Sequence, residues 1–444
     1  MNKKPQALNA KSQTKEDKWI LSKLNTIVKE ITKNLEEYKL GEAARQLYGF
    51  VWHEYADKYI ETSKKQKKDV NKQVFKIILK LLHPFMPFIT EHLWQMNKNK
   101  KPLIISGGGV ARAEGWKELQ EFAEYLQIPV ITSIMGIGTI SNESKCHLGI
   151  SVMGAGAKAA KETDVILALG CKFSFVMALG KEPVWNNSQK MIQVDIDPTI
   201  IGRAKPITLG IISDCKLFLK QMLEEVKKTE RVEKRDWLET LAENAQKNIR
   251  SLKKKSLIDK IPIRANRMVK EVLEFMDEDA ILVVDGGNIA GSTLAQVNFY
   301  KARPPLSTLI AIGMGHLGTS VPYGIGVKLA KPDKQVITMS GDGSFMMNFQ
   351  DLETAVRLGL KNLIYVIGNN SAWGMIKTAQ QYLYRKRYID TEFSDFDYGK
   401  AAVGFGCYGE EVTDPNEIKP ALERAKSSGK PAVIDIKIKY EPRV

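Results

Sequence analysis

Residues 334–344 read KQVITMSGDGS, and residues 361–370 read KNLIYVIGNN. Each segment contains an apolar run typical of a buried strand and ends in small or polar residues. Residues 349–360 lie between them and are predicted to form the crossover helix of a βαβ unit. Because neighbouring parallel strands end at the same edge of a sheet, Asp342 and Asn370 are expected to lie close together. The pattern therefore predicts an α/β fold with polar side chains at the carboxyl ends of two strands.

These residues suit a diphosphate that is bound through Mg²⁺. A carboxylate oxygen and an amide oxygen are ligands that Mg²⁺ accepts, and phosphate oxygens can fill its remaining positions. Gly341 and Gly343 have no side chain, so the backbone can approach the phosphates closely. A GDG triplet alone is weak evidence, and its alternative interpretation is a structural turn. GDG and NN together, each at the end of its own predicted strand, are a specific signal.

GDGSF at 341–345 with NN at 369–370 resembles the thiamine-diphosphate signature of the acetolactate synthase and benzoylformate decarboxylase superfamily. The resemblance implies thiamine diphosphate bound through Mg²⁺. It also implies three metal ligands: the side chains of Asp342 and Asn370, and the backbone carbonyl of Ala372. Gly341, Gly343 and Ser344 would then hold the diphosphate.

Three further loops extend this resemblance. GMGHLG at 313–318 fits a dinucleotide fingerprint, but its continuation, VPYGIGVKLAKPDKQVITMSGDG, matches the thiamine family instead. Leu317 and Gly318 would lie beside the cofactor rings, where the family places a bulky apolar residue that keeps the cofactor bent. Gly286, Gly287 and Asn288 follow the apolar run AILVVD and resemble the loop on the other side of the diphosphate. Trp373 and Met375 are candidate substrate-pocket residues, with ordinary core filling as the alternative.

Residues 1–100 are basic and helical in pattern. They hold 20 Lys and Arg against 11 Asp and Glu, a net charge of +9 out of +15 for the whole chain. Residues 15–96, with Ala43-Ala44, Phe50-Val51-Trp52 and HPFMPFITE, resemble the anticodon-binding helical domain of valyl-tRNA synthetase. HIGH-type and KMSKS-type signatures do not occur in the 444 residues, which argues against amino-acid activation.

The resemblance leaves tRNA binding through residues 1–98 open. The densest basic cluster in this segment consists of Lys64, Lys65, Lys67 and Lys68. The alternative interpretation is a solvated lysine-rich loop. His53, His83 and His92 lack the spacing of metal ligands and are interpreted as structural.

Residues 103–228 alternate strand-like runs with helical stretches, which predicts a second parallel sheet. ISGGGV, PVITSIMGIG, DVILALGCKF and IQVDIDPTIIG resemble the central domain of the same thiamine family, which holds FAD or an adenine nucleotide in some members. Candidate residues for such a site are Gly107–Gly109, Gly154–Gly156, Asp195 and Asp197, and the two aspartates fit a plain turn equally well. Cys171-Lys172 stands where acetolactate synthases often have an arginine, which argues against FAD.

The length and composition of the chain agree with a protein of several domains. The chain of 444 residues is 43% hydrophobic and 26% charged, which predicts several globular domains. It has no run of 18 apolar residues, its first 18 residues lack the apolar core of a secretion signal, and its four cysteines lie far apart. We therefore expect a cytoplasmic protein without a membrane partner, a disulfide framework or a zinc site.

The predicted fold class is α/β, with two doubly wound parallel-sheet domains preceded by an all-α helical bundle. The predicted domains are a helical anticodon-binding-like domain at 1–98, a thiamine-enzyme central domain at 99–228, a helical linker at 229–260, and a diphosphate-binding domain at 261–444.

One expected part of the family is not found in this sequence. Family members begin with a pyrimidine-binding domain, whose glutamate activates the cofactor through the aminopyrimidine ring. Without that glutamate we expect a 2-oxo acid decarboxylase or carboligase of acetolactate synthase type that is inactive unless a pyrimidine-domain subunit completes it. The resemblance also implies a homo-oligomer. Two other hypotheses remain open: a tRNA-binding protein with a cofactor-binding remnant, and a fusion of two gene pieces with no joint activity.

Overall fold

The computed structural model divides into two compact units, Met1–Lys100 and Lys101–Val444. The residues that the structure describes are 14–37, 39–63, 74–75, 77–78, 81, 101–150, 153–228, 231–232, 235–300, 302–311, 313 and 315–442. The predicted lysine cluster and two of the histidines lie outside these described residues; they are Lys64, Lys65, Lys67, Lys68, His83 and His92.

The described part of the first unit is helical. Its segments are α1 (Lys15–Glu36), α2 (Leu40–Gly49), the π-helical segment η2 (Phe50–Ile60) and α3 (Glu61–Ser63). Thr14 and Asp17 form a capping box at the start of α1, which satisfies backbone N–H groups that the helix cannot pair internally. Asp17 also accepts a buried hydrogen bond of 2.6 Å from the Tyr59 hydroxyl. The same carboxylate therefore caps one helix and joins it to another.

The second unit begins with a six-stranded parallel sheet in the order β3-β2-β1-β4-β5-β6. Its strands are β1 (Pro102–Ser106), β2 (Val130–Thr132), β3 (His147–Ile150), β4 (Val165–Leu169), β5 (Lys190–Asp195) and β6 (Leu209–Ile212). Its helices are α6 (Gly108–Arg112), α7 (Trp116–Leu126), α8 (Ala155–Glu162) and α9 (Cys215–Val226), with 3-10 segments η3 (Ile134–Gly136) and η4 (Phe175–Gly180). All residues of β1 and β4 are buried, as expected for central strands that helices cover on both faces.

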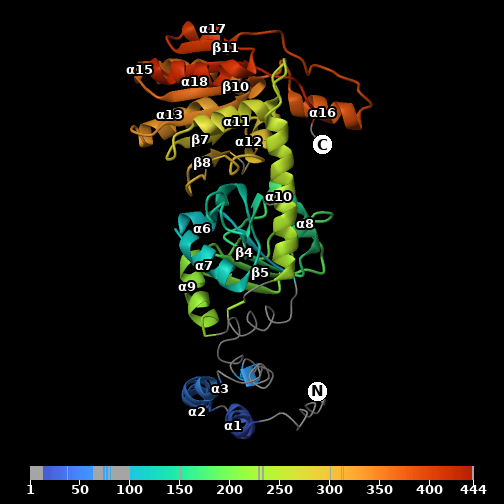
Figure 1. The fold of residues 1–444 in the computed structure, drawn as a ribbon, viewed down its shortest axis with the longest axis vertical. Coiled ribbons are helices and arrows are strands. Elements are labelled where there is room, and N and C mark those ends of the chain that lie inside the picture. Colours follow the sequence, from blue (N-terminus) through green and yellow to red (C-terminus); the bar gives the residue numbers. More distant parts are fainter. Residues whose placement is uncertain are drawn as a thin grey trace. The chain divides into compact units, whose positions relative to one another are not determined.

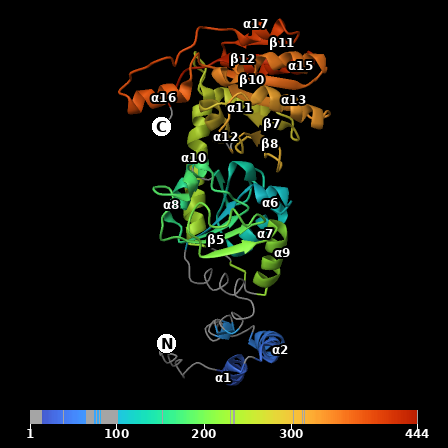
Figure 2. The same cartoon turned by 180° about the vertical axis from the view of Figure 1, so that it is seen from behind.

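A long helix, α10 (Asp236–Ser256), connects this sheet domain to the next one (Figures 1 and 2). It packs against α8 at one end and against α11 of the last domain at the other. Near its start, Trp237 is buried, and its indole N–H donates a hydrogen bond of 3.1 Å to the carbonyl of Pro102. The connector therefore packs along the central domain.

The last domain contains a second six-stranded parallel sheet, in the order β11-β12-β10-β9-β7-β8. Its strands are β7 (Ile281–Val284), β8 (Thr308–Ile310), β9 (Val336–Gly341), β10 (Leu363–Asn369), β11 (Tyr408–Val412) and β12 (Ala432–Lys437). Its helices are α11 (Ala265–Phe275), α12 (Asn288–Leu294), α13 (Ser320–Ala330), α14 (Asp342–Met346), α15 (Leu352–Arg357), α16 (Gly374–Leu383), α17 (Tyr398–Val403) and α18 (Ile418–Ser427), with 3-10 segments η5 (Phe349–Asp351) and η6 (Pro415–Glu417).

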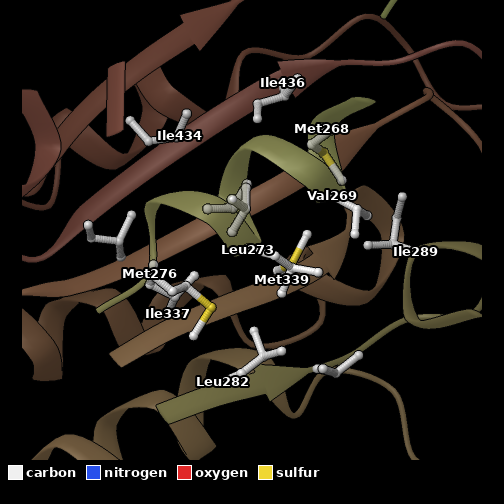
Figure 3. Packing of buried hydrophobic residues seen from close by; sticks show 14 of the residues in the cluster. Met268, Val269, Leu273, Met276, Leu282, Ile289, Ile337, Met339, Ile434 and Ile436 are labelled. Carbon is white, nitrogen blue, oxygen red and sulfur yellow. The ribbon is translucent and has the colours of Figure 1, made fainter. Parts of the chain in front are cut away.

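Alternate residues of these strands pack on opposite faces of the sheet. Ile337 and Met339 of β9 pack with Met268 and Leu273 of α11 in one buried cluster, which Figure 3 shows from close by. On β10, Ile364 and Val366 belong to that cluster. The intervening residue Tyr365 points to the other face, where it belongs to a second cluster with residues of α13, α15 and α17. Helices therefore cover both faces, and only the strand ends and connecting loops are left to bind a ligand.

The strand order of the second sheet places those loops. From β7 the chain forms β8 on one side and then crosses to β9 on the other side of β7, so the winding direction reverses between β7 and β9. Doubly wound sheets bind ligands outside the carboxyl ends of strands at such a point. The loops after β7 and β9 carry Gly286 and Asp342. The predicted fold class is confirmed: two parallel α/β sheets with a helical region before them.

Candidate cofactor and metal site

Asp342 lies at the centre of the candidate site. It follows β9, begins α14 and is only 3% exposed. Its Oδ1 accepts a hydrogen bond of 2.8 Å from Gly343 N, and its Oδ2 accepts bonds of 3.1 Å and 3.2 Å from Asn370 N and Ala372 N. Burial raises the pKa of Asp342, while these backbone hydrogen bonds oppose the shift. The structure thus brings together the three residues that the sequence suggested as metal ligands.

The donor set at this position fits a hard divalent cation. Within the described part of the chain, the side-chain oxygen Oδ1 of Asn370 is buried and has no hydrogen-bond partner. A buried carboxylate beside an unpartnered amide oxygen is costly in an apolar interior unless a cation is bound there. Mg²⁺ prefers such oxygen ligands.

Glycines bring the loops after β7 and β9 into contact. Gly286 has φ +85°, and a Cβ atom on it would lie 2.8 Å from Gly341 N. A Cβ atom on Gly343 would lie 2.8 Å from the ring of Trp373, and one on Gly287 would lie 2.3 Å from Sδ of Met375. No other residue fits these positions without displacing its neighbours. The glycines therefore allow the loop after β7 to lie against the end of β9, and they allow Trp373 and Met375 to pack over Gly343 and Gly287.

Asn288 joins this surface to the metal ligands. It begins α12 directly after Gly287. A Cβ atom on Gly374 would meet the Nδ2 atoms of both Asn288 and Asn370, at 2.7 Å and 3.3 Å. Among the described residues, Nδ2 of Asn288 is buried without a hydrogen-bond partner. The Asn288 amide is therefore a hydrogen-bond donor close to the candidate metal ligand Asn370.

The loop that contains Leu317 and Gly318 is anchored to the GDGS segment. Gly318 N donates a bond of 3.0 Å to the Ser344 hydroxyl, and the Gly318 carbonyl accepts one of 2.7 Å from Asn348 Nδ2. Leu317 is 39% exposed, so its side chain is partly available to a ligand. This anchoring places Leu317 beside the segment that holds Asp342.

Trp373 and Met375 differ in their surroundings. The half-buried Trp373 packs edge-on against Phe393 with ring centroids 5.2 Å apart, and it covers Gly343. Met375 is 58% exposed although its sulfur approaches Gly287. Of the two, Met375 has more surface free for a substrate.

Two further residues hold these loops, and sequence reasoning missed the contacts of both. Asp285 is buried; its Oδ1 accepts a bond of 2.6 Å from Gly286 N and its Oδ2 one of 2.8 Å from Ser320 N, so it joins the loop after β7 to α13. Asn348 holds Gly318, as described above. Asp285 could be noticed in the sequence because it is the acidic residue that ends the apolar run AILVVD. Nothing in the sequence around Asn348 indicates its role.

The central domain reaches the same loops through Phe175 of η4. A Cβ atom on Gly315 would lie 3.4 Å from the Phe175 ring, which is itself 55% exposed. A central-domain side chain therefore contacts the loop that carries Leu317.

The glycine-rich loop of the central domain packs against its own backbone. A Cβ atom on Gly107 would lie 2.0 Å from the carbonyl oxygen of Gly170, which shows how close the two segments are. Asp195 accepts a hydrogen bond from Asp197 N, and Asp197 accepts bonds from Thr199 N and the Thr199 hydroxyl. These contacts are those of turn residues.

Three protein-family models match the chain. The model described as the C-terminal TPP-binding domain of thiamine pyrophosphate enzymes matches residues 288–436, and the model of their central domain matches residues 89–222. The model of the anticodon-binding domain of tRNA ligases matches residues 17–150. Beyond Lys100, this last match falls on β1, β2 and β3 of the parallel sheet.

Curated relatives are similar to the same region. A probable acetolactate synthase large subunit of Methanococcus aeolicus is 32% identical, over 76% of this chain and 58% of the relative. The acetolactate synthase large subunit of Corynebacterium glutamicum is 30% identical, over 81% of this chain and 59% of the relative. The putative thiamine pyrophosphate-containing protein YdaP of Bacillus subtilis is 30% identical, over 78% and 58%. The chain thus spans less than two thirds of these relatives' lengths.

The close approach at Gly286 predicts a specific sensitivity. Replacing Gly286 by Ala places a side chain at φ +85° and against Gly341 N, so we expect a loss of about 1–3 kcal/mol in the free energy of unfolding. The matched control is Gly326→Ala in α13, where a Cβ atom meets nothing within 4 Å and a gain of roughly 0.5–1 kcal/mol is expected. Denaturant unfolding of both variants measures the difference. Equal stabilities would contradict the close contact.

Proposed function

The α/β part of this chain, residues 101–444, belongs to the thiamine pyrophosphate enzyme family of acetolactate synthase type, and from this premise we propose that it binds thiamine diphosphate through Mg²⁺ for chemistry on a 2-oxo acid. When bound, the cofactor supplies the nucleophilic carbon and the electron sink for decarboxylation and for ligation to a second carbonyl compound. The observation that carries the proposal is the backbone hydrogen bond from Asn370 to Asp342, together with the buried Asn370 side-chain oxygen, which has no hydrogen-bond partner within the described part of the chain.

Each loop has a separate role in this proposal. Asp342, Asn370 and the Ala372 carbonyl would hold the metal ion. The segments Gly286–Asn288 and Gly341–Ser344 would hold the diphosphate from two sides, since glycine lets both backbones approach it. Leu317 and Gly318 would support the cofactor rings, and Met375 with Trp373 would border the substrate pocket.

We propose in addition that residues 1–444 need a carboxylate from another polypeptide segment to activate the cofactor. Among the described residues of the candidate site, the buried carboxylates are Asp285 and Asp342, and both accept hydrogen bonds from two or more backbone N–H groups. Neither is available to exchange a proton with the cofactor ring. A pyrimidine-binding domain, in a longer chain or in a second subunit, would supply this group, and a homo-oligomer located in the cytoplasm is part of the same proposal.

The metal assignment predicts the effect of one substitution. Asp342→Ala should weaken Mg²⁺-dependent binding of thiamine diphosphate by about ten- to a hundredfold, on the order of the ~1.5–3 kcal/mol of an interaction with a charged group. Chelation of the metal in the parent protein should lower the affinity in the same way. Asp333→Ala, an exposed carboxylate in the turn before β9, is the control. Calorimetric titration measures all three, and parent-like affinity of Asp342→Ala would remove the metal assignment.

The activation proposal predicts the behaviour of the cofactor's C2 proton. With residues 1–444 alone, exchange of this proton for deuterium should be as slow as in the free cofactor. The reason is that the buried carboxylates of Asp285 and Asp342 already accept backbone hydrogen bonds. Quenched-flow NMR at saturating cofactor measures the rate. Addition of a polypeptide with a pyrimidine-binding domain should accelerate the exchange. Fast exchange by this chain alone would show that it contains an activating acid.

A second candidate function concerns the first unit. The match to an anticodon-binding domain and the net charge of +9 over residues 1–100 favour contact with tRNA. In this proposal the helical unit binds RNA mainly through phosphate contacts.

Counterion release makes the RNA proposal testable. The Kd for tRNA should rise by about tenfold or more between 50 mM and 200 mM salt, because several phosphate contacts are lost together. Filter binding with the full chain measures it, and replacement of Lys64, Lys65, Lys67 and Lys68 by Gln should reduce the salt dependence. Absent or salt-independent binding would leave the basic residues as solvated surface.

A further inference from the structure

The turn that carries the proposed metal ligands is held from one side by Asp342. The hydrogen bonds from Asn370 N and Ala372 N to Asp342 Oδ2 fix this turn relative to β9. Between those two residues lies Ser371, whose φ of +49° is left-handed, a conformation that costs free energy for a residue other than glycine. The turn therefore requires further contacts to keep its shape.

Asn369, the last residue of β10, holds the turn from the other side. It is 3% exposed, and its Oδ1 accepts a hydrogen bond of 3.2 Å from Ser371 N. Its Nδ2 donates to Asp435 Oδ2 at 3.1 Å and to the Phe396 carbonyl at 3.0 Å. The side chain of Asn369 thus connects the strained residue of the turn to β12.

Asp435 is an expensive residue to bury at this position. It lies within β12, is 0% exposed and also accepts a hydrogen bond of 3.0 Å from Tyr398 N. Burial raises the pKa of Asp435 to about 6, although the hydrogen bond from Tyr398 and the charge of Lys437 oppose the shift. A fully buried carboxylate destabilises a fold unless its contacts favour the charged form. Its bond to Asn369 is therefore made at a considerable desolvation cost.

The neighbouring charges distinguish this cluster from a second metal site. Asp397, Glu411 and Asp435 each have a carboxylate oxygen within 4.8 Å of the others. The ammonium group of Lys437 lies among the acidic groups, 3.2 Å from Glu411 Oε2, 3.7 Å from Asp435 Oδ2 and 2.7 Å from Asp395 Oδ1. The cluster therefore already has a cation, the Lys437 ammonium group, beside two of its three carboxylates.

We propose that Asp435 is a positioning residue of the metal site: acting through Asn369, it sets the position of the Asn370 and Ala372 ligands relative to Asp342. This inference rests on the proposed function, because it requires that the turn binds a divalent cation. It adds a residue that lies two strands away from β9 in the sheet and contacts none of the three proposed ligands.

The two common divalent cations respond differently to a displaced ligand. Mg²⁺ requires nearly octahedral geometry with short bonds, whereas Ca²⁺ accepts more ligands at longer and more variable distances. A positioning residue should therefore affect Mg²⁺ affinity more than Ca²⁺ affinity. A residue that merely stabilises the fold should affect both equally.

The test uses the full chain in a fixed excess of thiamine diphosphate, and calorimetric titration with Mg²⁺ or Ca²⁺, with a titration of each metal into the cofactor alone as the blank. Asp435→Ala should weaken Mg²⁺ binding about tenfold and Ca²⁺ binding less than about threefold, in keeping with the loss of one hydrogen bond to a charged group. Asn369→Ala should give the same ratio. The double variant should lose no more than the larger single effect, because both residues act along one path.

Two further variants serve as controls. Asp435→Asn keeps the shape of the side chain and an oxygen that Asn369 Nδ2 can bond, so its Mg²⁺ affinity should stay within about threefold of the parent. Asp395 is an acidic partner of Lys437, and its own side chain is 86% exposed. The Asp395→Asn substitution should therefore leave the Mg²⁺ and Ca²⁺ affinities unchanged.

Distinct outcomes separate the two levels of the proposal. Parent-like Mg²⁺ affinity in Asp435→Ala, or an equal loss for Mg²⁺ and Ca²⁺, would overturn the positioning role. If Asp435→Ala does not fold, Asn369→Ala decides by the same two criteria. Parent-like Mg²⁺ affinity in Asp342→Ala would instead overturn the metal site itself, whatever the Asp435 variants show.

Discussion

The carboxylate of Asp342 is the group on which the candidate site depends. It is buried at the end of a central strand, where burial disfavours its charge, and it is kept there by hydrogen bonds from three backbone N–H groups. Those bonds also draw the turn after β10 toward the end of β9. The proposed divalent cation would balance this charge and would also give the buried Asn370 oxygen, which has no partner among the described residues, a ligand role.

The sheet supplies the geometry that no single loop contains. Three loops that are distant in sequence, after β7, β9 and β10, meet because their strands are adjacent and parallel. They can meet so closely only because Gly286 and Gly343 leave no side chain between them. Backbone amides and small residues at such a junction can surround a diphosphate, and the closed, apolar faces of the sheet exclude other positions for it.

The sequence allowed the proximity of Asp342 and Asn370 to be predicted, because its information is local. Asp342 and Asn370 stand at the ends of apolar runs, and a parallel sheet has to bring such ends together. The contacts of three further residues were not predictable in this way. Asp285 joins two loops 35 residues apart, Asn348 holds Gly318, and Asp435 contacts Asn369 across 66 residues. Their partners are fixed by tertiary packing, so a single sequence gives no signal of these contacts. The fold class and the family were readable for the opposite reason, since strand periodicity and contiguous motifs persist over tens of residues.

Phe175 of the central domain lies against Gly315 of the last domain, so the two domains share a contact near the candidate site. It means that a side chain from the central domain lies against the loop that carries Leu317, although every proposed ligand of the metal and the diphosphate lies in the last domain. A chimera that keeps the last domain and receives the central domain of a relative would therefore keep every proposed ligand and exchange only the side chain that lies against this loop. Recombination between the two domains can vary the surroundings of the loop without any change in the proposed ligands.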